Sequence, residues 1–474
     1  MKLRTVFMVA ILCVALLFTA TGCKKVKQLS PEQVRDEMLA QYEKYCEAVS
    51  NASDLIIEAA YTRSRVVGGE RYTEQVTETI AYRGLGTENP ASVVKQQVAF
   101  GPYSTQYAEY YSQKTAYCKT DNSTFRSNMD FQQFQSRHIP AIPIDAALYS
   151  TVEVAKNGDD TIATFSGPQK LEHWVTDYSG AGLVSASGTI TVDKDGNVRN
   201  ITYSAQYTCD TVTYDFQVLM SVKLETAQGM DEDFSGLSAS GPLLSYFDAP
   251  RKILQVVGDV YTAQAMSAEY TETVHSDAFA RSRSQVSTFD TYGTGEDFMA
   301  QSSYEVVNTD YSNTPVANSE VVVFKDGVCL SSLNGATPAV REGIQPETMR
   351  NYCEDAVLAA LFTPNHFKNA RLTTTKYHLR IDFDGNEEFA NNLCSSIYAV
   401  FNADLDYYAE SFVTPTASGY LCINKATGLP TYLGVSLERI HTIGEVDYPL
   451  TYQLKQTMQL SSTTAYQNII DAIS

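Results

Sequence analysis

Residues 198–224 read VRNITYSAQYTCDTVTYDFQVLMSVKL, and this stretch decides the fold class. Apolar or aromatic side chains occupy every second position on both sides of Asp210. They are Ile201, Tyr203, Ala205, Tyr207, Cys209, Val212, Tyr214, Phe216, Val218, Met220, Val222 and Leu224. A period of two places successive side chains on opposite faces of a strand. The stretch therefore predicts two long antiparallel strands that share one strongly apolar face.

The same pattern returns 232 residues further along the chain. The turn glycine Gly196, which precedes the first pair of strands, aligns with Gly428 without a gap. Five alternating positions align as well: Tyr214 with Val446, Phe216 with Tyr448, Val218 with Leu450, Met220 with Tyr452 and Val222 with Leu454. The helix-like segment 250–261 also resembles the one that follows Ser30. A shared turn and a shared order indicate two copies of one α+β unit rather than chance alternation.

This interpretation divides the chain into five segments. A leader covers residues 1–22 and a membrane tether covers 23–29. The first unit follows over 30–225, and the second unit covers 243–474. Residues 226–242 between them are rich in Gly, Ser and acids, which is typical of a flexible linker.

The first residues have the layout of a secretory signal. Lys2 and Arg4 form a positive segment, and residues 6–19 form an apolar run. This run is shorter than the ~20 residues that a membrane-spanning helix requires. Small residues at 20–22 directly precede Cys23. The layout predicts that the protein is exported from the cytoplasm.

The Gly22-Cys23 junction resembles the lipobox of bacterial lipoproteins. The resemblance implies that Cys23 is a lipidation site: the leader is removed before it, its thiol receives a diacylglycerol, and a fatty acid such as palmitate acylates its amino group. Ala20 departs from the Leu that usually stands three residues before the cysteine, and the alternative is an ordinary signal peptide with a chance cysteine. Because two or three acyl chains anchor a protein durably, we expect a cell-membrane location on the extracytoplasmic face.

Composition excludes several classes of protein. The 474 residues include 55 acids and 35 bases, which gives a net charge of −20, and 44% of the residues are hydrophobic. The hydrophobic content is too high for a disordered chain. The negative charge repels phosphate groups, so we expect no nucleic-acid partner.

No motif in the sequence indicates catalysis, a metal or a cofactor. The six histidines are scattered, and neither His-Glu-x-x-His, Cys-x-x-Cys nor a Gly-rich phosphate loop occurs. The segments 193–197 and 382–387 contain several acids, but their glycine stands fourth, where an EF-hand loop has it sixth. Seven cysteines follow Cys23, and most lie in apolar patterns that favour buried thiols over disulfides. We therefore expect neither an enzyme nor a metal or cofactor site.

An early helix, a long antiparallel meander with further helices, and a lipobox together resemble the lipoprotein-carrier superfamily of the LolA, LolB and LppX types. The resemblance implies the fold class α+β, with two tandem curved antiparallel half-barrel sheets and helices covering the concave face. Members of that superfamily bind acyl chains or other apolar ligands inside the half-barrel. No sequence motif carries a binding residue over to this chain, so the ligand-binding residues stay unknown at this stage.

The sequence leaves several functions open. The leading hypothesis is a lipid-anchored extracytoplasmic binding module, not an enzyme, for an apolar ligand or an envelope lipid. Tyrosines that recur over 103–117 either line such a binding surface or pack within the sheet. The alternative is an envelope scaffold with filled cores that binds a partner protein. A transporter solute-binding subunit is less favoured, because such proteins alternate strands and helices around a parallel sheet.

The lipobox makes a direct prediction. In wild-type protein purified from membranes, mass spectrometry of the N-terminal peptide should show fatty acids on Cys23. The Cys23→Ser variant lacks the thiol that accepts the lipid, so it should leave the membrane fraction. A wild-type peptide without any acyl mass would contradict the prediction.

Overall fold

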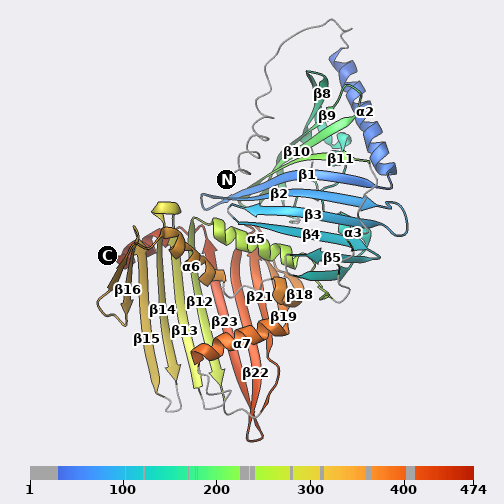
Figure 1. The fold of residues 1–474 in the computed structure, drawn as a ribbon. Helices are drawn as coiled ribbons and strands as arrows, with labels where there is room; N and C mark the ends of the chain where they lie inside the picture. Colours follow the sequence, from blue (N-terminus) through green and yellow to red (C-terminus); the bar gives the residue numbers. More distant parts are fainter. Residues whose placement is uncertain are drawn as a thin grey trace.

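The fold contains two antiparallel sheets, and neither closes into a barrel (Figure 1). The structure is a computed structural model that describes residues 30–473 apart from 102, 121–122, 169, 177, 179, 225–233, 235–236, 238–240, 278–280, 310–313, 359–363 and 402–410. The predicted leader, the tether with Cys23 and most of the predicted linker lie outside the described residues. The expectation of open antiparallel sheets accompanied by few helices is confirmed.

The first sheet has the strand order β6-β5-β4-β3-β2-β1-β11-β10-β9-β8-β7. Its strands are β1 (Leu55–Val67), β2 (Glu70–Arg83), β3 (Ala91–Phe100), β4 (Tyr103–Ser112), β5 (Thr115–Lys119), β6 (Thr124–Asn128), β7 (Tyr149–Asn157), β8 (Asp160–Pro168), β9 (Gly182–Val192), β10 (Val198–Cys209) and β11 (Val212–Lys223). The alternating stretch that opens the sequence analysis forms β10 and β11, and Tyr203 pairs with Val218 between them.

The second sheet has the order β17-β16-β15-β14-β13-β12-β23-β22-β21-β19-β18, and β20 pairs with β22 outside this path. Its strands are β12 (Ala265–Ser276), β13 (Arg281–Tyr292), β14 (Met299–Thr309), β15 (Pro315–Lys325), β16 (Val328–Leu333), β17 (Ala339–Glu342), β18 (Phe367–Thr374), β19 (His378–Gly385), β20 (Ser411–Phe412), β21 (Thr416–Asn424), β22 (Pro430–Ile443) and β23 (Val446–Leu460). In each sheet the first strand pairs with the last strand, as β1 does with β11 and β12 with β23. Both sheets thus have the same connectivity, while the exact domain boundaries stay a prediction.

The helices lie at the edges and on the faces of these sheets. They are α2 (Pro31–Asn51), α3 (Phe131–Gln135), α5 (Ala249–Thr262), α6 (Pro346–Leu358), α7 (Glu387–Phe401) and α9 (Ala465–Ile473). Helix α2 begins with the capping box of Ser30 and Gln33, and it contacts β7 to β10. Ile469 of α9 packs against Val323, the neighbour of buried Phe324 in β15. Adjacent residues of a strand face opposite sides of the sheet, so α9 lies on the face opposite to Phe324. The helices therefore do not all cover one face, and a set of helices over one concave face stays a prediction.

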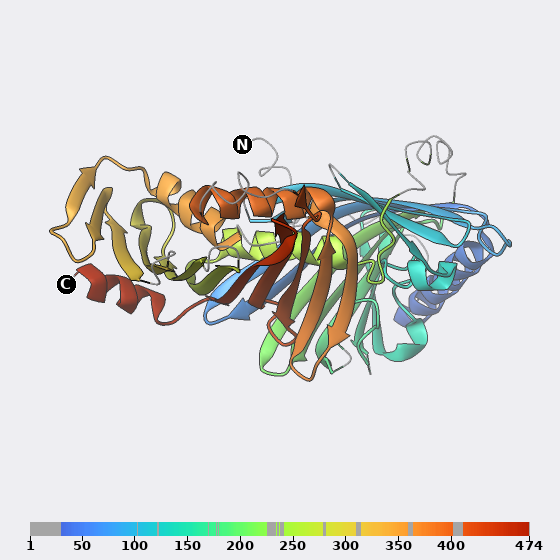
Figure 2. The same cartoon turned by 90° about the horizontal axis from the view of Figure 1, so that it is seen from below.

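Helix α5 lies between the two sheets, as the views in Figures 1 and 2 agree. It precedes the second sheet in the chain, yet it contacts β3 and β4 of the first sheet as well as α6. One apolar core runs through both sheets and includes Ile253 and Val256 of this helix. We call the first sheet with α2 and α3 the first unit, and α5 with the remaining elements the second unit.

The thiols of the described residues fit a further inference from the sequence. All seven cysteines from Cys46 onward are free thiols, and five of them are buried, as the apolar pattern around them indicates. Within the described part of the chain, no helix combines the length and the apolar character needed to cross a membrane.

The contact between α5 and the first sheet depends on a glycine. A Cβ atom added at Gly258 would lie 2.3 Å from Cγ of Phe100 in β3. Gly258→Ala should therefore lower the free energy of unfolding by about 1–3 kcal/mol through overpacking. Helix propensity alone would have the opposite sign, because alanine is favoured over glycine in helices by about 1 kcal/mol.

Urea unfolding of Gly258→Ala, Phe100→Ala and the double variant would measure the effect. Phe100→Ala removes the clashing ring atoms but keeps the Cβ that also lies close to the added methyl group, so it relieves the clash in part. The double variant should therefore lose less stability than the two single losses added together. Strict additivity, or stabilisation by Gly258→Ala, would contradict the predicted contact.

Candidate functional site

The candidate site is a pocket of about 470 Å³ between the two units. We call it the interunit pocket. Its first-unit lining consists of Tyr61, Arg63, Glu74, Glu78, Gln96, Glu109, Arg137, His138, Ile139, Trp174, Thr176, Tyr178, Tyr207, Cys209, Tyr214 and Phe216. Its second-unit lining consists of Tyr246, Asp248, Arg251, Lys252, Gln255, Leu372, Thr374, Leu379, Ile423, Asn424, Lys425 and Gly428. The pocket thus exists only where both units meet.

One wall of the interunit pocket is aromatic. Trp174, the only tryptophan of the chain, packs edge-on against Phe216 with 5.6 Å between the ring centroids. Tyr61 also packs against Phe216, with 5.8 Å between the ring centroids, and Tyr207 stacks on Tyr214 at 5.1 Å. These rings come from neighbouring strands β1, β10 and β11 and from the loop before β9. Such a wall suits the flat or apolar part of a ligand.

A network of buried charges, centred on Arg251 of α5, adjoins this wall, and the Arg63 guanidinium lies over the Phe216 ring, 5.6 Å from its centroid. Its guanidinium binds Glu74 with an N–O distance of 2.6 Å, donates to the Tyr61 hydroxyl at 3.1 Å and also donates to Gln96. Arg63 pairs with the same Glu74 carboxylate at 3.3 Å. Burial alone would raise the pKa of Glu74, but Arg251 and Arg63 bring it below its ordinary value. Glu74 is therefore held as a carboxylate.

A second ionic group lies beside this network. Arg137 binds Glu109 through two N–O contacts of 2.7 and 2.9 Å, and its Nε donates to Asp248 at 3.1 Å. Nε2 of His138 lies 3.3 Å from the same Glu109 carboxylate. Burial would raise the pKa of Glu109, yet Arg137 and His138 together hold it far below its ordinary value. Since Asp248 immediately precedes α5, this group also joins the two units.

A third ion pair lies deeper, between β1 and α5. Nη2 of Arg65 is 2.8 Å from Oδ2 of Asp259, and both side chains are almost fully buried. The Arg65 guanidinium also lies over the ring of Tyr72, 5.3 Å from its centroid. Because both charges are buried, such a pair is costly to break from one side only. The pair therefore helps to fix α5 on the inner face of the first sheet.

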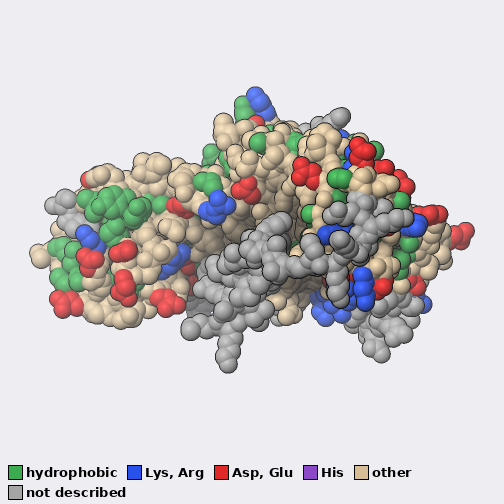
Figure 3. All heavy atoms as spheres, turned by 90° about the horizontal axis from the view of Figure 1, so that it is seen from above, with side chains coloured by type: hydrophobic (Ala, Val, Ile, Leu, Met, Phe, Trp, Pro, Cys, Tyr) green, Lys and Arg blue, Asp and Glu red, His purple; other side chains and the backbone are tan. Residues whose placement is uncertain are grey.

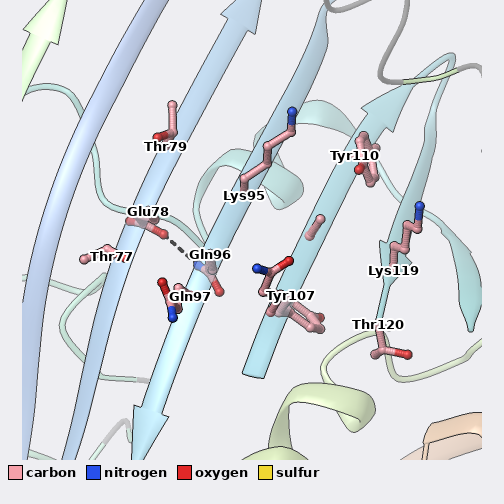
Figure 4. A pocket seen from close by; sticks show the side chains of 12 residues that line it. Thr77, Glu78, Thr79, Lys95, Gln96, Gln97, Tyr107, Tyr110, Lys119 and Thr120 are labelled. Atoms are coloured by element: carbon pink, nitrogen blue, oxygen red, sulfur yellow. Dashed lines mark hydrogen bonds between the residues drawn. The ribbon is translucent and has the colours of Figure 1, made fainter. Parts of the chain in front are cut away.

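Glu78 differs from the other acids of the pocket. It pairs across the strands with Gln96, whose amide donates to its Oε2 at 2.6 Å, as the dashed line in Figure 4 shows. Its Oε1 has no hydrogen-bond partner among the described residues, although the residue is only 5% exposed. Burial raises the pKa of Glu78 above its ordinary value.

A second, more open pocket of about 530 Å³ adjoins β2 to β5 (Figure 4). Its exposed lining includes Lys95 and Lys119, and Tyr107, Glu78 and Gln96 contribute to it as well. On the face shown in Figure 3, acidic and basic side chains are interspersed over the first unit. We regard this open hollow as secondary, because it lacks both the enclosure and the convergent buried charges of the interunit pocket.

The structure tests some of the site predictions that were made from the sequence. Cys23 lies outside the described residues, so its lipidation stays a prediction. Among the tyrosines of 103–117, Tyr103 stacks on Tyr261 of α5, and Tyr111 packs against Phe131 and Phe134. These two are packing residues rather than pocket residues. Within the described ranges, no three His, Cys, Asp or Glu side chains are arranged to hold a metal ion.

The sequence analysis missed the charged residues of the pocket. The signal was present in β2, where Glu74 and Glu78 alternate in step with the buried Val76 and Ile80. Acids at the apolar positions of an alternating strand face the interior, and buried charges are rare unless they are paired or functional.

Comparisons with known proteins do not assign a family. No family model matches the chain. No curated protein matches it. Among solved structures, LprF from Mycobacterium bovis is 11% identical with a TM-score of 0.23, over 40% of this chain and 92% of that one. A DUF1329 family protein from Desulfovibrio piger is 11% identical with a TM-score of 0.19, over 44% of this chain and 97% of that one. OccK2 from Pseudomonas aeruginosa is 8% identical with a TM-score of 0.12, over 86% and 98%. At these scores the likenesses carry no argument about fold or function.

The ionic group around Glu109 predicts a specific dependence of stability on pH. A carboxyl group with a lowered pKa in the folded state stabilises the fold above its unfolded pKa of about 4.5, and this contribution is lost as the pH falls. Glu109→Gln should therefore unfold more easily at pH 7, by about 3 kcal/mol, because Arg137 loses a buried partner. Between pH 5 and pH 3 the stability of wild type should fall more steeply than that of the variant.

Denaturant unfolding at several pH values would measure both effects. Glu58→Gln is the matched control, because Glu58 is half exposed and its pair with Lys223 lies at the surface. An exposed pair contributes only about 0–1 kcal/mol, so the control should follow wild type. Parallel pH curves for wild type and Glu109→Gln would contradict the prediction.

Proposed function

We propose that this protein is a lipid-anchored, extracytoplasmic binding protein, not an enzyme, that holds an amphipathic small molecule in the interunit pocket. The anchor is the predicted lipid on Cys23, and the location is the outer face of the cell membrane. The observation that carries the proposal is a pocket lined by both aromatic rings and buried charged groups.

Pocket size and composition support this function. Its volume of about 470 Å³ lies within the range of about 300–1,000 Å³ that is typical of small-molecule sites. The sequence favoured an apolar ligand, and the rings of Trp174, Tyr207 and Phe216 suit an apolar portion of it. Arg251, Lys252 and the buried acids require a polar portion as well. An amphipathic ligand satisfies both kinds of lining group.

One observation favours the scaffold as a second candidate function. Val286, Val307, Val321 and Val340 are 38–59% exposed, and the strand register of β13 to β17 places them on one face of the second sheet. Exposed apolar side chains gathered on one sheet face are typical of protein-binding surfaces. Crosslinking in cells would then recover one partner protein, and blocking the interunit pocket would leave that crosslink unchanged.

Native mass spectrometry of protein extracted from membranes in mild detergent would test the binding function. Wild type should carry a small molecule in addition to the mass of its lipidated chain. Gln255→Phe should lower the occupancy several-fold, because Gln255 of α5 lines the interunit pocket and the larger ring would fill it. Gln97→Phe is the matched control, since Gln97 is exposed and lines only the open hollow of β2 to β5.

The outcome separates the two candidate functions. Occupied wild type, occupied Gln97→Phe and depleted Gln255→Phe would support the binding protein. Wild type that is repeatedly empty, or equal occupancy in both variants, would overturn the assignment of the ligand to the interunit pocket.

A further inference from the structure

Glu78 is the uncompensated acid of the interunit pocket. Glu74 pairs with two arginines, and both Glu109 and Asp248 pair with Arg137. Glu78 receives one amide hydrogen bond from Gln96, and among the described residues no lysine or arginine forms an ion pair with it. Its Oε1 is buried without a hydrogen bond among the described residues, so the desolvation cost of the group is offset only in part.

The neighbours of Glu78 do not remove this deficit. Arg251 donates to the amide oxygen of Gln96, and the amide nitrogen of the same side chain donates to Glu78. The charges of His138 and Arg251 offset the burial of Glu78 only in part, so its pKa stays raised. His138 lies against Glu109, with Nε2 3.3 Å from that carboxylate. A hydrogen-bond donor supplied by a ligand would satisfy Oε1 and complete the pocket.

We infer that the ligand of the interunit pocket carries a protonated amine, which donates to Oε1 of Glu78 while the organic part lies against the aromatic wall. This inference rests on the proposed function and specifies the ligand class. A primary ammonium group has three donors and a full positive charge, so it matches an acid with a free oxygen. The rings of Tyr61 and Trp174, which line the pocket, also favour a cation through their electron-rich faces.

The size of the pocket limits the source of the amine. A volume of about 470 Å³ holds a small aromatic or alkyl amine, or the headgroup of an amine-bearing lipid. Both sources share the ammonium group that Glu78 recognises. The tethered protein would meet either one at the outer face of the membrane.

Three probes of similar shape test the charge preference: 2-phenylethylamine, 2-phenylethanol and 3-phenylpropanoate. Emission of Trp174 reports binding without a label, because this single tryptophan lines the pocket. Titrations of full-length protein at pH 7 should give at least about tenfold tighter binding of the amine than of the alcohol or the acid. Glu78→Gln, which keeps the size of the side chain, should abolish that preference.

Glu58→Gln removes an exposed acid from β1 and should keep the preference, which controls for net charge. Vesicles of phosphatidylethanolamine and of phosphatidylglycerol distinguish the two sources. Emission changes with phosphatidylethanolamine alone indicate a lipid headgroup, whereas binding of 2-phenylethylamine without a response to vesicles indicates a free amine.

The inference fails if neither 2-phenylethylamine nor phosphatidylethanolamine binds, if the alcohol or the acid binds as tightly as the amine, or if Glu78→Gln keeps the preference. These results leave the proposed function intact as long as native mass spectrometry finds a co-purifying molecule that Gln255→Phe displaces. Wild type that is empty there overturns the proposed function itself.

Discussion

The arrangement of the two units depends on the ion pairs that α5 forms with the inner face of the first sheet. Arg251 pairs with Glu74, and Asp259 pairs with Arg65, so one helix of the second unit supplies both signs of charge to the first. Taking these groups out of water is expensive, and only the specific docked geometry compensates the cost. Gly258 permits the close approach to Phe100 that this geometry requires. The charges therefore specify one position of α5 rather than simply adding stability.

The interunit pocket is a consequence of that docking. The apolar part of the first sheet is covered by α2, where Met38, Tyr42 and Val49 are buried. The part that faces α5 carries charged and aromatic side chains instead, and these line a space rather than fill it. An interior of this kind differs from the uniformly apolar half-barrel that the sequence resemblance implies. It suits a ligand with a charged end and an apolar end.

The sequence predicted the sheets well because their signal is local. Alternation over 201–224 requires no knowledge of distant contacts, and the capping box at Ser30 likewise depends on neighbouring residues. The site depends on contacts between residues nearly 200 positions apart, such as Arg65 with Asp259. A helix at 250–261 was visible in the sequence, but its packing on the other unit was not. Glu74 and Glu78 were readable in principle, since they occupy the inward phase of β2.

The central claim is that the interunit pocket is a ligand site. Its most direct test is an experimental electron-density map of the protein, purified gently from its native membrane. The account predicts continuous density for an organic molecule between the aromatic wall and α5, with a donor atom within about 3 Å of Oε1 of Glu78. A pocket that contains only water, or one closed by the side chains of α5, would contradict it.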